Sequence, residues 1–445
     1  MTNDENDLVL PASLLDTDLY KFTMQQAVLQ HFPGVQGTYK FTHRDADVFF
    51  SRECFDRFKR SVSHFDKIQL TQEEREWLTK ACPYLKPSYL DFLSSYRFNP
   101  SQLRLRFEPI PEDADKDAHG DGSARGHIRI DAAGPWHETI LWEVPLMACL
   151  SEIFFTTVDT DWNYDGQEEQ AYEKAKTLLN AGCTFSEFGT RRRRSYYTQD
   201  LVMKAILRAQ NDNPDAKGRV SGTSNMHFAM KYNVAPVGTI AHEWFMGVGA
   251  LKGYQGVNAT ALRLWEEVYP DVLRIALTDT FSTEAFYKAC PRPLPSSWLD
   301  FVKDPHFAQQ WTGLRQDSGD PFVFAPRALE IYNQLGVDHT RKTIIFSDAL
   351  NVQKALKLKK QCDELGFKCA FGIGTSLSND FKRVSSGGKE KSRALNMVIK
   401  LSSVDGKPTV KISDEITKNT GDPATVRHVK ELFGIPITDK DEVIH

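Results

Sequence analysis

The sequence has few cysteines and lacks any arrangement of them that would indicate a disulfide framework or a zinc site. The seven cysteines are widely spaced, their number is odd, and no two form a C-x-x-C pair. Reduced thiols of this kind are typical of cytosolic and nuclear proteins, so we expect a cytoplasmic or nuclear location. Their positions are Cys54, Cys82, Cys149, Cys183, Cys290, Cys362 and Cys369.

Long hydrophobic runs and a basic leader are also missing. We find no stretch that approaches the ~20 apolar residues of a membrane span. The N-terminus, MTNDENDLVLPASLL, is acidic and has no basic segment followed by an apolar run, which argues against a secretory signal or a transit peptide. The formal net charge of -4 argues against a nucleic-acid-binding protein. We therefore expect a soluble protein without a membrane or nucleic-acid partner.

The 445 residues allow roughly two or three domains, and the two parts of the chain differ in character. Residues 1–150 predict an N-terminal α+β domain. It has a helix within residues 14–32, capped by Asp16 or Thr17, and strands within 37–44 and 126–136.

The acidic, Gly-containing stretch 108–126 has aspartates two residues apart, as a calcium loop does. Such a loop needs Gly at its sixth position and Glu at its twelfth, and the sequence supplies Ala118 and Ala124. A solvated hairpin tip is the better interpretation.

From residue 184 onward, short β-branched or apolar runs end in Gly, Thr, Ser or Asp, and helix-like segments follow them. Such alternation predicts parallel βα units, and near eight units a closed (β/α) barrel of about 250 residues is the economical arrangement. We expect this α/β barrel over residues 151–394, and we expect part of 395–445 to complete the N-terminal domain. The seven units are TFSEFGTR, VSGTSN, VAPVGTIAHE, IALTDTFS, GLRQDSGD, TIIFSDALN and FGIGTSLSND.

Side chains at the carboxyl ends of barrel strands line one shared mouth. Gly-Thr recurs at four of these ends, at 189–190, 222–223, 238–239 and 374–375. Glycine lets backbone amides approach a ligand, threonine adds a hydroxyl, and a following helix N-terminus favours negative charge. The predicted mouth is therefore suited to phosphates.

Four consecutive arginines, residues 191–194, follow the first of these strand ends. We place them in the βα turn and the first turn of a helix over SYYTQDLVMKAILRAQ. There, arginine can hold a phosphate or carboxylate with two parallel hydrogen bonds. Because successive helical residues point ~100° apart, only one or two can face the mouth. Arg191 or Arg193 is our first choice, and the others should pair with acids or solvent. A basic surface patch for localisation is the alternative.

Four further strand ends carry chemistry-bearing groups. In GLRQDSGDP, Arg315 can hold a planar anion while Asp317 and Asp320 suit ribose hydroxyls or a magnesium-bound phosphate, although a turn with a structural ion pair is the alternative. Thr375 follows a G-x-G stretch that offers backbone amides to a terminal phosphate. Asp279 and Asp348 fit helix capping as well as substrate contact.

His242 follows the Gly-Thr pair at 238–239 and lies beside Glu243. Imidazole is the side chain best able to act as a base or as a phosphoryl acceptor near neutral pH. A buried histidine with a purely structural role is the usual alternative for such a residue.

Eight segments of the chain, taken in order, resemble the nicotinate phosphoribosyltransferase family. They are LLDTDLYKFTM, FSEFGTRRR, GTSN, VGTIAHEW, ALTDTF, RQDSGDP, FSDALN and FGIGTSLSND. The resemblance spans about residues 13 to 430. It implies the type II phosphoribosyltransferase fold, an irregular (β/α) barrel with an N-terminal sandwich-like α+β domain, in a homodimer whose sites lie near the subunit interface.

The implied reaction converts nicotinate and phosphoribosyl pyrophosphate to nicotinate mononucleotide and pyrophosphate, with Mg²⁺, in the salvage of NAD. It is coupled to hydrolysis of ATP as a co-substrate, and no permanently bound organic cofactor is implied. Since the chain has no Walker A sequence, ATP would bind in the phosphoribosyl site. Transfer to nicotinamide or quinolinate on the same fold is an alternative. More distant alternatives are a basic-patch nucleic-acid binder, and a barrel phosphatase or aldolase.

The resemblance also assigns roles to residues. His242 would be transiently phosphorylated, with Thr239 beside it, and Arg315 would contact nicotinate. Tyr20 would reach the nicotinate ring from the other subunit. Asp317, expected to be catalytic with His242, would hold ribose and magnesium-bound pyrophosphate together with Asp348, and no residue is assigned as a direct metal ligand. The remaining expected substrate-binding residues are Phe188, Arg191, Ser318, Gly319, Gly374 and Thr375, of which Thr375 would contact the phosphoribosyl phosphate.

Overall fold

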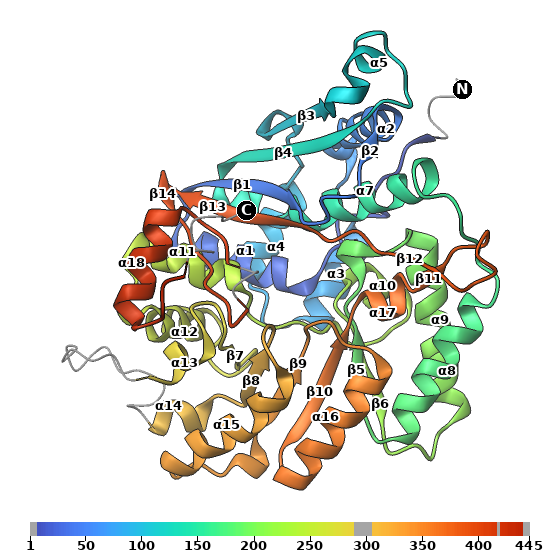
Figure 1. Ribbon diagram of the computed structural model, residues 1–445. Coiled ribbons are helices and arrows are strands. Elements are labelled where there is room, and N and C mark those ends of the chain that lie inside the picture. The colour runs from blue at the N-terminus through green and yellow to red at the C-terminus, as the bar shows by residue number, and fades with distance from the viewer. Residues whose placement is uncertain (1–6, 289–304, 416–418, 439–445) are drawn as a thin grey trace.

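The computed structural model describes residues 7–288, 305–415 and 419–438, and two sheets organise them (Figure 1). The first sheet is antiparallel, with strand order β14-β13-β1-β4-β2 and with β3 paired to β4. Along β1, burial alternates because successive side chains point to opposite faces, so that Tyr39 and Phe41 face the core. The strands are β1 (Gln36–His43), β2 (Phe50–Ser51), β3 (Leu103–Pro109), β4 (Arg125–Pro135), β13 (Met397–Val404) and β14 (Lys407–Pro408).

The pairing of β1 with β13 joins residues that lie far apart in the sequence. It is antiparallel and runs from Gly37 opposite Val404 to His43 opposite Met397. The late part of the chain therefore returns to the sheet of the first domain and passes above the second sheet (Figure 1).

Residues 7–157 form seven α-helices before, between and after the early strands of the first sheet. The first begins at Leu19 with Asp18 at the N-cap, so the expected cap at Asp16 or Thr17 is corrected; Asp16 instead accepts hydrogen bonds from Arg193. The helices are α1 (Leu19–His31), α2 (Arg52–Val62), α3 (Gln72–Ala81), α4 (Pro87–Ser95), α5 (Ala114–Ala118), α6 (Trp136–Thr139) and α7 (Glu143–Thr157).

The run Trp136–Thr157, which comprises α6 and α7, corrects the expectation that no stretch resembles a membrane span. It has 22 residues, and its most apolar window has a mean hydropathy of 1.4, enough by length and composition to cross a bilayer. However, 89% of its most apolar window is buried inside the protein, and α7 packs against α2 and β13. These are the surroundings of a core helix.

Residues 108–126 form the tip of the β3–β4 hairpin, as expected, and α5 lies at its far end (Figure 1). The carboxylates of the tip pair with cations: Asp113 with Arg125 and Lys116, and Asp117 with Arg52. Asp113 and Asp117 therefore take part in ion pairs and do not form a calcium loop.

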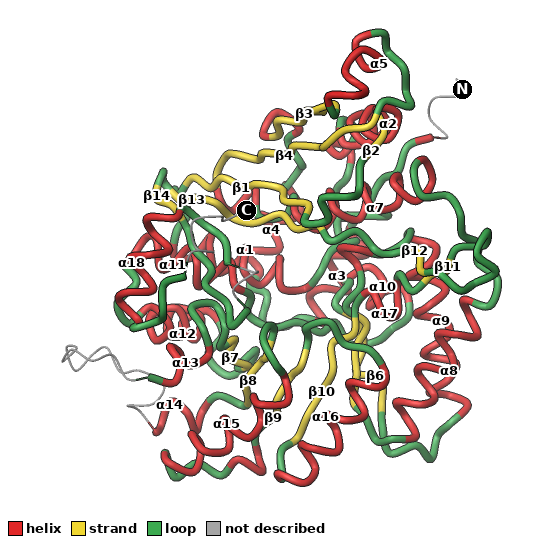
Figure 2. Tube along the Cα trace, viewed as in Figure 1, coloured by secondary structure: helices red, strands yellow, loops and turns green. Residues whose placement is uncertain are grey.

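The second sheet is parallel, with strand order β6-β5-β10-β9-β8-β7. Figure 2 shows its strands, in yellow, with helices around them. The strands are β5 (Thr184–Glu187), β6 (Arg219–Thr223), β7 (Ile275–Leu277), β8 (Gly313–Gln316), β9 (Thr343–Phe346) and β10 (Lys368–Ile373). The α/β class, with an N-terminal domain and a parallel sheet, is confirmed.

Only six of the seven expected strands form. VAPVGTIAHE makes a single bridge, between Pro236 and Thr223 of β6. Proline has no N–H to donate to a strand ladder. The two backbones also approach closely at this point, since a Cβ added at Gly222 would come within 1.9 Å of the carbonyl oxygen of Ala235. Pairing among the described residues therefore ends at β6 and β7, and the barrel is irregular rather than regularly closed.

The helices that follow the sheet strands are α8 (Gln167–Asn180), α9 (Tyr196–Asp212), α10 (Met226–Lys231), α11 (His242–Lys252), α12 (Val257–Val268), α13 (Thr283–Tyr287), α14 (Pro305–Gln310), α15 (Pro321–Gln334), α16 (Val352–Leu365) and α17 (Thr375–Ser378). The chain then forms a small hairpin of β11 (Phe381–Lys382) and β12 (Lys391–Ser392), and it later adds α18 (Pro423–Phe433).

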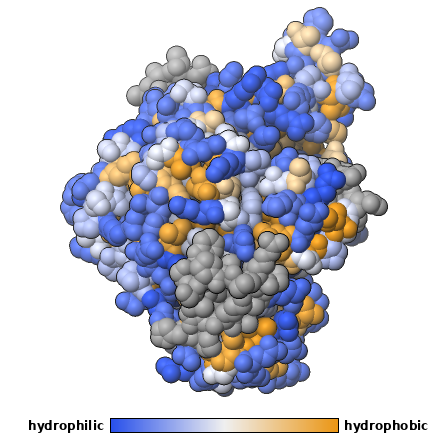
Figure 3. All heavy atoms as spheres, turned by 90° about the vertical axis from the view of Figure 1, so that its left-hand side faces the viewer, coloured by the Kyte–Doolittle hydropathy of each residue, from blue (hydrophilic) through white to orange (hydrophobic). Residues whose placement is uncertain are grey.

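On the face that carries α12, α13 and α18, hydrophilic residues predominate and apolar residues lie in small groups (Figure 3). Scattered apolar residues of this kind are normal on a surface that faces water. The six described cysteines are free thiols, and Cys290 lies outside the described residues.

Candidate active site

A cavity of about 210 Å³ lies between the carboxyl ends of β8 and β9 and strand β13 of the first sheet. We call it the His242 cavity. Six of the predicted site residues line it together, although they come from five separate parts of the sequence. They are Tyr20, Arg191, His242, Arg315, Asp317 and Asp348.

Arg315, the third residue of β8, is fixed by three hydrogen bonds. Its Nε donates to Ser347 Oγ at 2.8 Å, Nη1 to Thr239 Oγ1 at 2.8 Å, and Nη2 to Asp317 Oδ1 at 3.0 Å. A guanidinium has five N–H groups. Two therefore remain for a ligand, and a planar carboxylate is the partner that such a fork suits best.

His242 begins α11, and both of its ring nitrogens have partners. Nδ1 lies 3.0 Å from Thr280 Oγ1, and Nε2 lies 3.1 Å from Asp317 Oδ2. Burial and the nearby Lys411 charge lower the pKa of His242 to about 4, against the opposing pull of Asp279 and Asp317. The imidazole is therefore neutral near pH 7, which leaves a nitrogen lone pair able to attack an electrophile.

Asp317 connects these two residues. One oxygen accepts from Arg315 and from Ser347 Oγ at 2.6 Å, and the other lies against His242. Burial alone would raise the pKa of Asp317, but Arg315 and His242 outweigh it and hold this pKa well below its usual range. The carboxylate is therefore ionised and acts as a fixed negative link between the arginine and the histidine.

The His242 cavity carries more positive than negative side chains. Six cations face it against four carboxylates, which gives a formal balance of +2. Burial, together with Lys411 and Arg44, holds the pKa of Lys400 well below its usual value. Such crowding of cations costs free energy unless anions bind among them. The cations are Arg44, Arg191, Arg192, Arg315, Lys400 and Lys411, and the carboxylates are Glu143, Glu243, Asp317 and Asp348.

Arg44, Arg192, Lys400 and Lys411 are the cations of the cavity that the sequence did not lead us to select as site residues. Arg44 follows β1, and Lys400 lies on β13 opposite Lys40. Only the antiparallel pairing of these two distant strands brings them to the site. No local motif marks them, and a sequence argument would have needed that pairing in advance.

Tyr20 lines the His242 cavity of its own chain, and the expectation that a Tyr20 from another subunit reaches the nicotinate ring stays a prediction. Its hydroxyl donates to Glu143 Oε2 at 3.4 Å, and Glu143 also accepts from Arg191 at 3.0 Å. Beneath them, Lys21 is fully buried between Glu143, at 2.5 Å, and Glu243, at 2.7 Å. This network fixes both Tyr20 and Arg191 against the cavity.

The four arginines have four different surroundings. They do not enter α9: a 3₁₀ turn covers Thr190–Arg192, the backbone is extended at Arg193, and the helix begins at Tyr196 with Ser195 as its N-cap. Arg191 faces the His242 cavity, as expected. Arg192 lines it as well, and its guanidinium makes no hydrogen bond or ion pair with any described residue.

The other two arginines are structural, so of the two expected candidates, Arg191 and Arg193, the choice of Arg193 is wrong. Arg193 is buried and contacts Asp16 with two hydrogen bonds of 2.8 Å. Arg194 is fully buried, lies 3.6 Å above the ring of Phe155, and donates to Ser392. Because both are buried, the run is not a basic surface patch, and a nucleic-acid binder built on it is excluded.

We expect Arg193→Met to lower the free energy of unfolding by about 3–5 kcal/mol, because it leaves the buried Asp16 carboxylate without its cation. Burial alone would raise the pKa of Asp16, whereas Arg193 and its hydrogen bonds lower that pKa to about 2. Urea unfolding near pH 7 measures the loss. As a control, Arg208→Met removes an exposed arginine paired with Glu168 and should cost under about 1 kcal/mol. Equal losses in the two variants would contradict this assignment.

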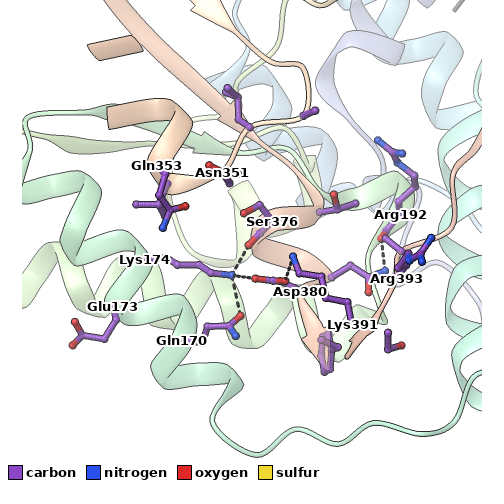
Figure 4. A pocket seen from close by; sticks show the side chains of 18 of the residues that line it. Gln170, Glu173, Lys174, Arg192, Asn351, Gln353, Ser376, Asp380, Lys391 and Arg393 are labelled. Atoms are coloured by element: carbon purple, nitrogen blue, oxygen red, sulfur yellow. Dashed lines mark hydrogen bonds and ion pairs between the residues drawn. The ribbon is translucent and has the colours of Figure 1, made fainter. Parts of the chain in front are cut away.

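A second cavity, of about 730 Å³, adjoins the first, because Arg192 and Ala349 line both. We call it the Lys174 cavity (Figure 4). It contains Thr375, the first residue of α17, together with cationic side chains from α8, from β12 and from the residue after β12. These cations are Lys174, Lys391 and Arg393. The predicted phosphate-binding residue and the predicted histidine therefore lie in neighbouring cavities rather than on separate surfaces.

The remaining predicted site residues support the cavities without lining them. A Cβ added at Gly372 would lie 2.4 Å from the Phe188 ring, and one at Gly374 would lie 3.1 Å from the Phe188 carbonyl oxygen. Ser318 donates to the buried Asp279, and Gly319 has a φ of +77°, which favours glycine. Thr239 accepts from Arg315.

Within residues 7–288, 305–415 and 419–438, no group of three His, Cys, Asp or Glu side chains is arranged to hold a metal ion. Mg²⁺ is commonly held by one or two carboxylates while substrate phosphates and water supply its other ligands. Asp317 and Asp348 both line the His242 cavity. These residues fit a magnesium ion that arrives with a phosphorylated substrate, and not a site formed by protein alone.

Comparison with known proteins gives one consistent result. The model of the nicotinate phosphoribosyltransferase (NAPRTase) family matches residues 183–437, and the model of its N-terminal domain matches residues 15–151. The chain is 42% identical to the probable nicotinate phosphoribosyltransferase of Schizosaccharomyces pombe, covering 96% of this chain and 98% of the relative. It is also 42% identical to the nicotinate phosphoribosyltransferase of Saccharomyces cerevisiae, covering 95% of each.

Solved structures agree with the sequence relatives. The crystal structure of a putative nicotinate phosphoribosyltransferase from Saccharomyces cerevisiae superposes with a TM-score of 0.86 at 41% identity, over 95% of this chain and 98% of that one. The nicotinate phosphoribosyltransferase from Porphyromonas gingivalis superposes with a TM-score of 0.82 at 33% identity, over 95% of this chain and 99% of that one. Both likenesses extend over the N-terminal domain and the barrel together.

Proposed function

The chain belongs to the nicotinate phosphoribosyltransferase family, and from this membership we propose how its two neighbouring cavities divide the reaction. The protein transfers a phosphoribosyl group to nicotinate, a step in the salvage of NAD. The pyridine nitrogen of nicotinate bonds to the anomeric carbon of phosphoribosyl pyrophosphate. The bond from that carbon to pyrophosphate breaks, and nicotinate mononucleotide and pyrophosphate are released.

We propose that nicotinate binds in the His242 cavity with its carboxylate on Arg315. The observation that carries this proposal is the fixed Arg315 fork, which keeps two N–H groups for a ligand beside Tyr20 and Arg191. Nicotinamide has no carboxylate for this fork and quinolinate has a second one to accommodate. The contacts therefore favour nicotinate over both alternative substrates.

We propose that the phosphoribosyl phosphate lies in the Lys174 cavity near Thr375, and that pyrophosphate lies between the two cavities. Arg192 lines both cavities, and its guanidinium has no hydrogen-bond or ion-pair partner among the described residues, so its charge is available to the leaving group. Asp317 and Asp348 would hold Mg²⁺, which neutralises charge on pyrophosphate. With both anions fixed, the ring nitrogen is oriented toward the anomeric carbon, and the cations absorb the charge that develops as the bond breaks.

We further propose that His242 couples this transfer to ATP hydrolysis. A lone pair of the neutral imidazole attacks the γ-phosphorus, the bond to ADP breaks, and water later releases phosphate from the histidine. The phosphoryl group adds roughly -1.5 to -2 charges if it behaves as on hydroxyl residues. Lys411, whose charge acts on His242, and Arg315, hydrogen-bonded to the same Asp317, would respond to it and tighten substrate binding.

Incubation with ATP labelled on its γ-phosphate, followed by peptide mapping, tests the coupling. The expected result is an acid-labile, alkali-stable label on the peptide that contains His242, lost when nicotinate and phosphoribosyl pyrophosphate are added. Label on a serine or threonine, or a label that survives turnover, would contradict the proposal. The assignment of the protein as a homodimer in the cytoplasm or nucleus is also a proposal, which rests on the resemblance and on the cysteine pattern.

A further inference from the structure

The ammonium group of Lys174 organises one wall of the Lys174 cavity (Figure 4). This side chain comes from α8, is 16% exposed, and makes three hydrogen bonds. Nζ donates to Gln170 Oε1 at 2.9 Å, to the Ser376 carbonyl oxygen at 2.6 Å, and to Asp380 Oδ2 at 2.7 Å. An ammonium has three N–H groups, so all of them are in use.

Two of these bonds hold the turn that carries Thr375. Ser376 lies within α17, directly after Thr375, and Asp380 lies just beyond the helix. On its other side, the same turn is tied to the arginine turn: Asn379 Nδ2 donates to the Arg192 carbonyl oxygen at 2.8 Å. The turn that carries Thr375 is therefore held on two sides, by Lys174 of α8 and by the arginine turn that follows β5.

Lys174 also acts on a second cation. Asp380 Oδ1 lies 3.5 Å from Lys391 Nζ, while its Oδ2 accepts from Lys174 (Figure 4). The Lys391 side chain is 70% exposed, so Asp380 is the contact that draws this flexible side chain toward the cavity. One partly buried ammonium thus sets the place of Thr375 and, through Asp380, the place of Lys391.

We propose that Lys174 is a positioning residue for the phosphoribosyl substrate. It holds the Thr375 turn and the Asp380–Lys391 pair in the geometry that receives the phosphate at the far end of the ribose from the reacting carbon. This inference rests on the proposed function, since it assumes that the phosphate lies beside Thr375. Because its three N–H groups are in use, Lys174 acts through these partners and does not itself contact the phosphate.

The geometry separates this role from a general contribution to folding. The contacts of Lys174 lie on the phosphate side of the molecule, whereas the predicted nicotinate contacts lie in the His242 cavity. Loss of a remote binding contact raises KM for the substrate concerned with a smaller change in kcat. A loss of folding would instead lower the amount of active enzyme for both substrates alike.

The test compares Lys174→Met, Lys174→Arg and the wild type in steady-state kinetics with each substrate varied in turn. For Lys174→Met we expect KM for phosphoribosyl pyrophosphate to rise roughly 10- to 100-fold, with KM for nicotinate and kcat changed by less than about 3-fold. Lys174→Arg keeps the charge and should restore part of the affinity. The matched control is Lys176→Met, on the same helix, which removes an exposed lysine that pairs with Glu173 and lies over the ring of Tyr172.

A second measurement gives a result even if a variant is inactive. Inorganic phosphate should raise the Tm of the wild type and of Lys176→Met, and it should raise the Tm of Lys174→Met much less. An unchanged KM for phosphoribosyl pyrophosphate in Lys174→Met, or equal losses for both substrates, would overturn the inference. If the wild type formed no nicotinate mononucleotide, the proposed function would fail, while the phosphate-dependent Tm shifts would still decide the role of Lys174.

Discussion

Replacing His242 with asparagine is expected to abolish ATP hydrolysis coupled to transfer while slow, ATP-independent transfer continues. Asparagine can keep a polar contact with Thr280 or Asp317, but its amide nitrogen has no nucleophilic lone pair. Formation of ADP should therefore fall by at least roughly 100-fold. Simultaneous measurement of ADP and nicotinate mononucleotide gives the ratio of the two products directly.

The control for this variant is His339→Asn. His339 lies at the opposite end of β9 and contacts the Leu365 carbonyl oxygen, far from either cavity in the chain's topology. It should leave the ratio of ADP to nicotinate mononucleotide unchanged. Retention of stoichiometric ADP formation by His242→Asn would show that the phosphoryl acceptor is another residue.

The second large effect is expected for Arg315→Met, which should lower kcat/KM for nicotinate roughly 100- to 1000-fold. The change removes the two N–H groups left for the substrate carboxylate, and it also takes the cation away from the partly buried Asp317. Arg315→Lys keeps a positive charge but cannot reproduce the fork, so it should recover little of the loss. Steady-state kinetics with nicotinate varied measures both variants.

Selectivity provides a sharper readout than rate for this arginine. If Arg315 holds the carboxylate, the preference for nicotinate over nicotinamide should shrink in both variants. Arg327→Met is the matched control, since Arg327 is a partly exposed arginine on α15 that pairs with Glu284 and Glu330. An unchanged preference in Arg315→Met would assign recognition of the carboxylate to another cation of the cavity.

Local sequence sufficed to find the part of the site that lies directly after the strands. Arg315 and Asp317 lie in or just after β8, Asp348 lies just after β9, and parallel strands bring their carboxyl ends to one rim. His242 was predicted in the same way, although the run before it forms only a bridge and no strand. These residues could be predicted because a place at the rim depends only on the direction of the strand and not on which strands pair.

The remaining cations of the site required information that is not local. Arg44 and Lys400 reach the cavity through the β1–β13 pairing, which joins residues about 360 positions apart. The arginine run shows the same limit at short range. Helical spacing suggested Arg193 as a ligand contact, but a break before α9 sends it to Asp16, a residue that sequence analysis had expected to cap a helix.

The most direct test of the whole account is release of pyrophosphate from phosphoribosyl pyrophosphate by the wild-type protein, measured with and without ATP. The account predicts release that requires nicotinate, matches nicotinate mononucleotide in amount, and becomes faster when ATP is present. Release that proceeds equally well with nicotinamide in place of nicotinate, or no release with either, would contradict it.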